Sequence, residues 1–198
     1  MSIIHPALVQ CDIPVFYATT EGQTRRIAER LVAIFRDRGF TSRAIDVATP
    51  DADDVDWSRA QATLVGASLH GHRHQRAVRS FVHDYAPELE LRPSTFFSVS
   101  LAAASDSAAE RDEAARIARA FADCEEWQPD ETVCLAGRLA YTKYRWLTRF
   151  VMKQIARRHG RPVDTTRDYE FTNWDEVARV ADRVIARIGA ERAAQAAA

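Results

Sequence analysis

Apolar runs rich in β-forming residues alternate with amphipathic helical stripes along this chain, and this alternation limits the available folds more than any other feature. Residues 13–18 (IPVFYA) form the first run, and an apolar helical stripe over 27–35 follows, ending before Gly39. Further strands are predicted at 42–47, 62–68, 95–101 and 132–139, and further helices at 75–86, 108–124 and 174–188. Near-continuous apolar strands between helices are typical of a buried parallel sheet. We therefore predict an α/β three-layer sandwich with a five-stranded parallel sheet and helices on both faces.

The 198 residues are expected to form one domain over 13–190, after an N-terminal extension over 1–12 and before an Ala-rich, disordered tail over 191–198. No apolar run approaches the ~18 residues of a membrane span. The first 12 residues contain no Lys or Arg and make a poor secretion signal. The three cysteines show no metal-ligand spacing and are expected to be reduced thiols in a cytoplasmic protein.

A polar turn between the first strand and the first helix is a candidate phosphate site. Ligands of such sheets bind beyond the carboxyl ends of the strands, and the free N–H groups of a helix N-terminus attract anions there. Hydroxyls and one glycine could complete a cradle for a phosphate monoester, although threonines that only cap the helix remain an alternative. The residues of this turn are Thr19, Thr20, Glu21, Gly22, Gln23 and Thr24.

Charge is distributed very unevenly. Residues 132–163 contain eight Lys or Arg and no Asp or Glu, whereas the whole chain has a formal charge of −1. An ordinary surface helix mixes both signs, so this window indicates an anionic partner. Nucleic acid is not expected, because no recognition module accompanies the charge. A membrane surface and a planar anionic ligand both remain open.

Several segments together resemble one family. They are 20–27 (TEGQTRRI), 66–69 (GASL), 98–101 (SVSL), 141–150 (YTKYRWLTRF) and 172–177 (TNWDEV). Over residues 13–188 the chain resembles the flavodoxin-type, menaquinone-dependent protoporphyrinogen IX dehydrogenases. The phosphate loop is shared with flavodoxins, which bind flavin mononucleotide (FMN), and the basic aromatic segment distinguishes this family from plain flavodoxins.

The resemblance assigns the cofactor contacts. The loop 19–24 would hold the ribityl phosphate, and two later loops would contact the isoalloxazine ring. These loops contribute Ser68, Leu69, His70 and Gly71 on one side, and Ser100, Leu101 and Ala102 on the other. The chain lacks the aromatic residue that the family usually carries before its Gly-His-x-His run. His70 or a residue of the basic segment is expected to stack on the flavin instead.

Histidines at alternate positions, His70, His72 and His74, have three interpretations. They could converge on a metal ion, but no carboxylate or cysteine joins them, and no metal is expected. His70 or His72 could transfer protons. The third interpretation is that all three are solvated loop residues.

The basic segment is predicted to be an insertion at the fifth strand, over about 140–167. Aromatic and apolar residues fall on one side of its expected helix, and cations spaced by four fall on the other. Such a helix suits an anionic membrane surface, or a tetrapyrrole whose propionates pair with arginine. The residues expected to contact substrate or membrane are Tyr144, Arg145, Trp146, Arg149 and Lys153.

The resemblance implies FMN-dependent oxidation of protoporphyrinogen IX to protoporphyrin IX in haem biosynthesis. A membrane quinone would accept the electrons, and the protein would associate peripherally with the inner face of the cell membrane. No catalytic side chain is assigned, because the flavin carries the redox chemistry. A flavodoxin-type electron carrier or a quinone reductase without porphyrin activity is the alternative. The sequence leaves open whether the chain forms a homo-oligomer.

Overall fold

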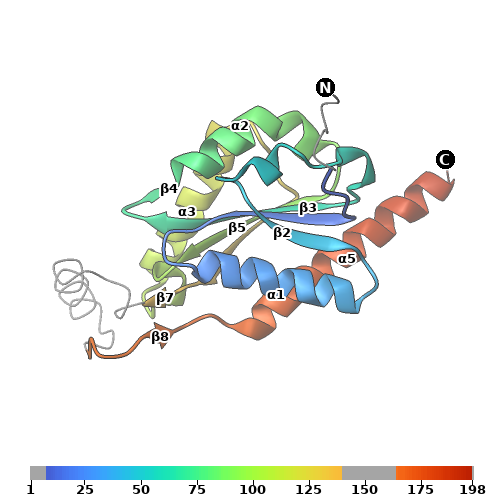
Figure 1. Ribbon diagram of the computed structural model, residues 1–198. Helices are drawn as coiled ribbons and strands as arrows, with labels where there is room; N and C mark the ends of the chain where they lie inside the picture. The colour runs from blue at the N-terminus through green and yellow to red at the C-terminus, as the bar shows by residue number, and fades with distance from the viewer. Residues whose placement is uncertain (1–7, 140–163, 198) are drawn as a thin grey trace, which may run out of the picture.

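Five parallel strands form the centre of the described molecule, in the order β2-β1-β3-β5-β6 (Figure 1). The computed structural model describes residues 8–139 and 164–197. The strands are β1 (Ile13–Ala18), β2 (Ser42–Asp46), β3 (Thr63–His70), β5 (Ser94–Ser100) and β6 (Glu131–Ala136). The predicted five-stranded parallel sheet is therefore confirmed. A two-residue strand, β4 (Arg73–His74), extends the sheet by pairing antiparallel with the end of β3.

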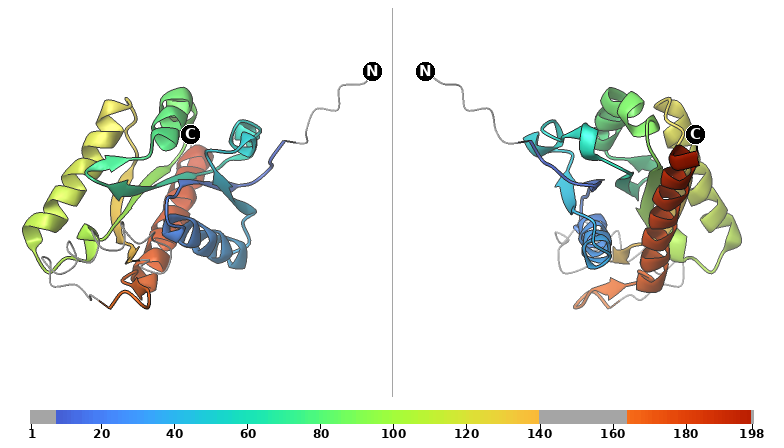
Figure 2. Two further views of the ribbon diagram at one scale, coloured as in Figure 1. Left: turned by 60° about the vertical axis from the view of Figure 1, so that its left-hand side comes forward. Right: turned by 90° about the vertical axis from the view of Figure 1, so that its right-hand side faces the viewer.

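Helices cover both faces of the sheet, as predicted. Figures 1 and 2 show α1 and α5 on one face and α2 and α3 on the other. The helices are α1 (Gln23–Asp37), α2 (Arg76–Glu90), α3 (Ala108–Cys124) and α5 (Trp174–Ala197), with short 3₁₀ turns at Pro50–Ala52, Trp57–Arg59 and Ala102–Ala104. Because the five strands are parallel, their carboxyl ends all lie at one edge of the sheet, where the loops of the candidate site emerge.

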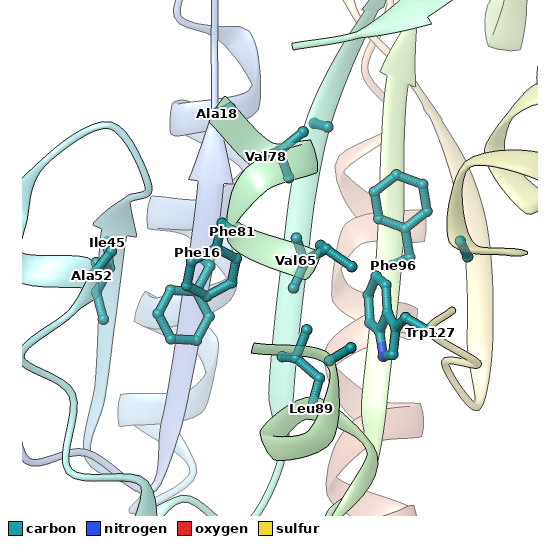
Figure 3. Packing of buried hydrophobic residues seen from close by; sticks show 14 of the residues in the cluster. Phe16, Ala18, Ile45, Ala52, Val65, Val78, Phe81, Leu89, Phe96 and Trp127 are labelled. Atoms are coloured by element: carbon teal, nitrogen blue, oxygen red, sulfur yellow. The ribbon is translucent and has the colours of Figure 1, made fainter. Parts of the chain in front are cut away.

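Aromatic rings fill the layer between the sheet and α2 and α3 (Figure 3). Phe16 of β1 lies 4.5 Å from Phe81 of α2, measured between ring centroids. Phe96 of β5 packs edge-on against the buried Trp127, whose indole N–H donates a hydrogen bond to Ser94 Oγ at 3.2 Å. Burying such large rings supplies much of the stability of this face.

The opposite face requires a glycine at the centre of the sheet. A Cβ added at Gly66 of β3 would come within 2.0 Å of the ring of Phe97, which is fully buried on the neighbouring strand. The ring of Phe97 thus occupies the space that a side chain at position 66 would need. This contact joins the apolar cluster formed by the sheet with α1 and α5.

Two predicted helix ends were wrong. The helix predicted at 75–86 was expected to end before Pro87, but α2 continues to Glu90. Pro87 lies near the helix end and removes only one backbone hydrogen bond, while the next turn buries Leu89 completely. The tail after residue 190 was expected to be disordered, but α5 continues to Ala197. Its Ala, Glu, Arg and Gln residues all favour helix.

Two predicted boundaries also shift. Residues 1–12 were expected to be an extension outside the domain, but Val9 and Cys11 are buried in the apolar cluster on the α2 and α3 side of the sheet. Val9 also forms an isolated bridge with Val55. The last strand was expected to run to residue 139, but it breaks at Gly137. The chain then forms β7 (Arg138–Leu139), which pairs antiparallel with β8 (Tyr169–Glu170).

Candidate functional site

A cavity of about 660 Å³ opens at the carboxyl edge of the sheet. This volume is typical of small-molecule and cofactor sites, at ~300–1,000 Å³. Loops after β1, β3, β5 and β6 and the first half of α3 supply its described walls. Of the residues expected at the cofactor, those lining it are Thr19, Glu21, Gln23, Thr24, Ser68, Leu69, His70, Gly71, Ser100, Leu101 and Ala102. Thr20 and Gly22 belong to the same loop but are not among the lining residues.

The turn after β1 leaves the N-terminus of α1 uncapped. Gly22 precedes the helix with φ +91°, a left-handed conformation that favours glycine, and no side chain caps α1. The Thr19 hydroxyl instead accepts a hydrogen bond from the Gly22 N–H at 2.9 Å, which closes the turn. The first turn of α1 contains no acidic residue. These features leave the amide groups of the first turn and the positive end of the helix dipole available to an anion.

Thr24 provides a second sign of a missing ligand. Its side chain is fully buried and lines the cavity, yet Thr24 Oγ1 has no hydrogen-bond partner within the described part of the chain. Burying a hydroxyl without a partner costs about 1–3 kcal/mol. A phosphate oxygen in the cavity would satisfy it. The capping alternative is not supported for Thr24, because a capping hydroxyl would accept a bond from the helix backbone.

Side-chain hydrogen bonds connect this loop to the β7–β8 ribbon. The Gln23 amide donates to Glu170 Oε1 at 3.1 Å and to Thr172 Oγ1 at 2.8 Å. The Thr172 hydroxyl in turn donates to the Ala136 carbonyl at the end of β6, at 2.7 Å. Arg26 forms an ion pair with Glu170 at 2.9 Å. The loop at 19–24 and the β7–β8 ribbon are thereby held as one unit.

The loop after β3 is a tight hairpin. β3 and β4 pair antiparallel, with Leu69 opposite His74 and His70 opposite Arg73. The two central residues, Gly71 and His72, have φ of +54° and +64°, as two-residue hairpin turns of type I′ require. His70 and His72 line the cavity and are exposed.

This pairing separates the histidines. Directly opposed residues of a ladder project from the same face, so His70 shares a face with Arg73, and His74 shares the other with Leu69. The three imidazoles therefore cannot converge, and the described residues contain no group of side chains able to hold a metal. The alternative that they form a metal site is not supported.

His74 is not a solvated loop residue, contrary to the third interpretation of the histidines. Its ring packs edge-on against Phe96 and at a tilt against Phe121, with centroid separations of 5.3 and 4.8 Å. Nε2 lies 3.0 Å from Ser98 Oγ on β5. Burial lowers the pKa of His74 to about 4, so the imidazole is neutral near pH 7. His74 anchors the hairpin to the sheet, while His70 and His72 remain candidates for acid–base chemistry.

Gln75 connects the hairpin to the phosphate loop. It precedes α2, and its amide N–H₂ group donates to Thr20 Oγ1 at 3.3 Å and to Ser68 Oγ. The two loops predicted to contact one cofactor are thus joined directly by a side chain. Sequence reasoning missed Gln75, since nothing in its local pattern distinguishes it from an ordinary residue before a helix.

The loop after β5 and the start of α3 form the far wall. Ser100 Oγ accepts a hydrogen bond from the Ala103 N–H at 3.2 Å, which begins the turn. Sequence analysis missed the contribution of α3, whose spacing of three to four residues places one helix face along the cavity. The lining residues that were not among the expected cofactor contacts are His72, Val99, Ala109, Glu110, Glu113, Ala114, Ile117, Gly137, Arg138 and Leu139.

The cavity offers apolar walls with few aromatic rings. Leu69, Val99, Ile117 and Leu139 supply aliphatic surface suited to a planar ring system. Among the described lining residues, the aromatic side chains are those of His70 and His72, so the absence of Tyr and Trp noted in the sequence persists here. The residues expected at substrate or membrane, Tyr144, Arg145, Trp146, Arg149 and Lys153, lie outside the described residues.

Comparison with known proteins shows which family this chain belongs to. The family described as "Flavodoxin domain" matches residues 14–166. Protoporphyrinogen IX dehydrogenase [quinone] of Escherichia coli strain K12 is 32% identical over 171 residues, covering 86% of this chain and 92% of that protein. The chain belongs to the flavodoxin-type protoporphyrinogen IX dehydrogenase family. The family protein of Leishmania major is 28% identical over 170 residues, covering 84% of this chain and 71% of that protein. Oxidised flavodoxin 2 of Bacillus cereus superposes with a TM-score of 0.47 at 15% identity, covering 64% of this chain and 84% of that one.

Membership of this dehydrogenase family implies a flavin cofactor, and the cavity fits one. The unpartnered Thr24 hydroxyl and the uncapped helix suit a phosphate, and the aliphatic walls suit a ring. As in the sequence, no described helix has the length and apolar character needed to cross a bilayer.

Proposed function

We propose that this chain oxidises protoporphyrinogen IX to protoporphyrin IX, with FMN as its cofactor and a membrane quinone as electron acceptor. The observation that carries the proposal is the 32% identity to the Escherichia coli dehydrogenase over most of both chains. The overall change removes six electrons and six protons from the substrate, and three quinones accept them in successive two-electron rounds. When bound, the flavin supplies the redox chemistry of each round.

The phosphate loop is proposed to hold FMN. Thr24 Oγ1 and the first-turn amides of α1 are the donors in place for the phosphate, and Thr19 and Gly22 fix the turn that presents them. Hydroxyls and amides donate to the phosphate without the flexibility of a lysine side chain. The glycine is needed because the backbone before α1 has a positive φ.

The hairpin and the two later loops are proposed to enclose the ring system. Leu69, Leu101 and Leu139 keep the walls apolar, which excludes water from a reactive ring. His70 and His72 line the same cavity from the turn and are the side chains proposed for proton transfer. We assign neither a specific step.

The substrate and membrane contacts are proposed to come from the basic segment. Leu139, the last described residue before it, lines the cavity, and Tyr169 after it pairs with Leu139. The described residues on either side of the segment therefore meet beside the proposed cofactor. Arg145 and Arg149 would pair with propionates or lipid phosphates, and Tyr144, Trp146 and Lys153 would add ring contacts and charge. This supports peripheral association with the inner face of the cell membrane.

The deciding experiment mixes purified protein with FMN under anaerobic conditions and then adds protoporphyrinogen IX. We expect a yellow protein that bleaches on addition of the porphyrinogen and regains its colour when a quinone is added. An electron carrier would stay yellow with the porphyrinogen alone. A protein that remains colourless with excess FMN would overturn the redox function.

A further experiment addresses the basic segment. Arg145→Ala with Arg149→Ala is expected to raise the KM for the porphyrinogen or to reduce sedimentation with vesicles of anionic lipid. Vesicles of neutral lipid are the control. Unchanged values for both properties would remove the segment from substrate and membrane binding.

A further inference from the structure

Charge in the cavity is poorly matched to a phosphate. The charged side chains among the described lining residues are three carboxylates, Glu21, Glu110 and Glu113, and one guanidinium, Arg138. A phosphate monoester carries nearly two negative charges near pH 7. The sequence indicated hydroxyls and amides as the phosphate ligands. These groups carry no full positive charge and so cannot balance the negative charges of the carboxylates and the phosphate.

Among the described residues, the half-buried side chain of Arg138 uses little of its hydrogen-bonding capacity. Its side chain is 15% exposed, and Nε is buried without a hydrogen-bond partner. Its charged partner among the described residues is Asp168, with Nη1 and Oδ2 3.7 Å apart. Nη2 donates to the carbonyl of Glu21 at 3.5 Å, a long hydrogen bond. A guanidinium has five N–H donors, so this partnering is sparse for a half-buried arginine.

Nearby arginines are already paired at short range. Arg25 lies 2.7 Å from Glu29, and Arg26 lies 2.9 Å from Glu170. Neither is among the cavity-lining residues. Arg138 therefore differs from its neighbours in both respects, since it faces the cavity and its ion pair is long.

The position of Arg138 indicates which chemical group its guanidinium would bind. Its hydrogen bond to the Glu21 carbonyl places the guanidinium beside the proposed phosphate loop, because Glu21 lies in the middle of that loop. Two donor atoms of the cavity, Arg138 Nε and Thr24 Oγ1, are buried and unpartnered. One anion with several acceptor oxygens would offer an acceptor to each of them, and phosphate is suited to this.

We propose that Arg138 is a phosphate-recognising residue that makes this chain select FMN over riboflavin. The inference rests on the proposed flavin function and adds to it a cation from the β7–β8 ribbon. The phosphate site is then formed by two regions distant in sequence, the loop after β1 and the strand after Gly137. The Gln23 bonds to Glu170 and Thr172 hold these regions in register.

The test measures the dissociation constants of FMN and riboflavin by quenching of flavin fluorescence in apoprotein variants. Arg138→Gln is expected to weaken FMN binding about ten- to hundredfold, the range of a hydrogen bond to a charged group. Riboflavin binding should change less than about twofold. Arg138→Lys should restore part of the lost FMN affinity, because lysine keeps the positive charge but lacks the paired N–H donors of the guanidinium.

Two controls separate this role from a structural one. Arg25→Gln removes the same charge from the first turn of α1 outside the cavity and should leave the FMN-to-riboflavin ratio nearly unchanged. Asp168→Asn removes the carboxylate beside Arg138 and should preserve the ratio or increase it. If the Arg138–Asp168 pair is purely structural, Arg138→Gln and Asp168→Asn should both lower the melting temperature. Each should then weaken the binding of FMN and of riboflavin equally.

Each other outcome overturns the assignment. An equal loss of FMN and riboflavin in Arg138→Gln makes Arg138 a structural residue. Unchanged FMN binding with a raised KM for the porphyrinogen assigns Arg138 to the substrate. If the wild-type protein binds neither flavin, the proposed function fails together with this inference, whereas normal FMN binding in both proteins refutes this inference alone.

Discussion

The two ends of the cavity present their polar groups in opposite ways. At the phosphate end, Thr24 and Arg138 hold buried donors without partners inside a frame of hydrogen bonds. At the hairpin end, His72 in the turn and His70 beside it are exposed, and the half-buried His74 has its partner in Ser98. Unpartnered buried donors reduce the stability of the apoprotein, so they are expected where a ligand compensates. The comparison suggests that the phosphate end is built for binding affinity and the base of the hairpin for stability.

Thr24→Val gives the sharpest test of the phosphate end. The variant keeps the volume and removes the hydroxyl, so FMN should bind about ten- to hundredfold more weakly by fluorescence titration. The apoprotein should be as stable as wild type or more stable, because an unpartnered buried hydroxyl is lost. Thr63→Val is the matched control. Thr63 Oγ1 is also buried and unpartnered, but Thr63 begins β3 and does not line the cavity. If both variants affect FMN equally, the comparison fails.

His74→Gln tests the base of the hairpin. The folded-state pKa of His74 is lowered to about 4, whereas the unfolded value is about 6.5. The unfolded state therefore binds more protons between these values, and stability is full above about pH 6.5 and falls as the pH decreases. We expect wild type to lose about 1–2 kcal/mol of unfolding free energy between pH 7 and pH 5 through this group.

His74→Gln should remove that loss, as measured by urea denaturation at both pH values. The control His83→Gln removes an exposed histidine of α2 and should keep the wild-type pH dependence. A pH dependence identical in wild type and His74→Gln would show that His74 does not anchor the hairpin by burial.

His72→Gly should have the smallest effect. His72 adopts a positive φ, which is unfavourable for a residue with a side chain, so glycine should stabilise the protein by up to about 1 kcal/mol. Riboflavin affinity should change less than about threefold, as judged by fluorescence. A larger loss would mean that the His72 side chain contacts the ring and that the hairpin tip also contributes to affinity.

Sequence patterns predicted the regular parts of this molecule and the position of its site. The strand at 13–18 has the predicted bounds, and the turn at 19–24 lies at the cavity as expected, because both depend on local patterns. Helix ends after Pro87 and beyond residue 190 were missed. There, tertiary burial of Leu89 and helix propensity in an Ala-rich run outweighed the local stop signals.

Residues that join the site from a distance could not be predicted in the same way. Arg138 was recognised as part of the acid-free window, but its contact with the Glu21 carbonyl depends on a break at Gly137 that the apolar run did not indicate. His74 alternates with two exposed histidines, and only the β3–β4 pairing shows that it points to the core. Long-range pairing decides both cases, and one sequence does not contain that information.

The β7–β8 ribbon has a consequence for how this family can diversify. Leu139 and Tyr169 are paired, so the residues that flank the basic segment are held together at the edge of the sheet. Evolution or an engineer can therefore exchange the segment for one of another length or charge while the sheet, its covering helices and the phosphate loop keep their contacts. The ribbon is therefore a position at which a segment can be exchanged without change to the contacts of the flavodoxin-like body.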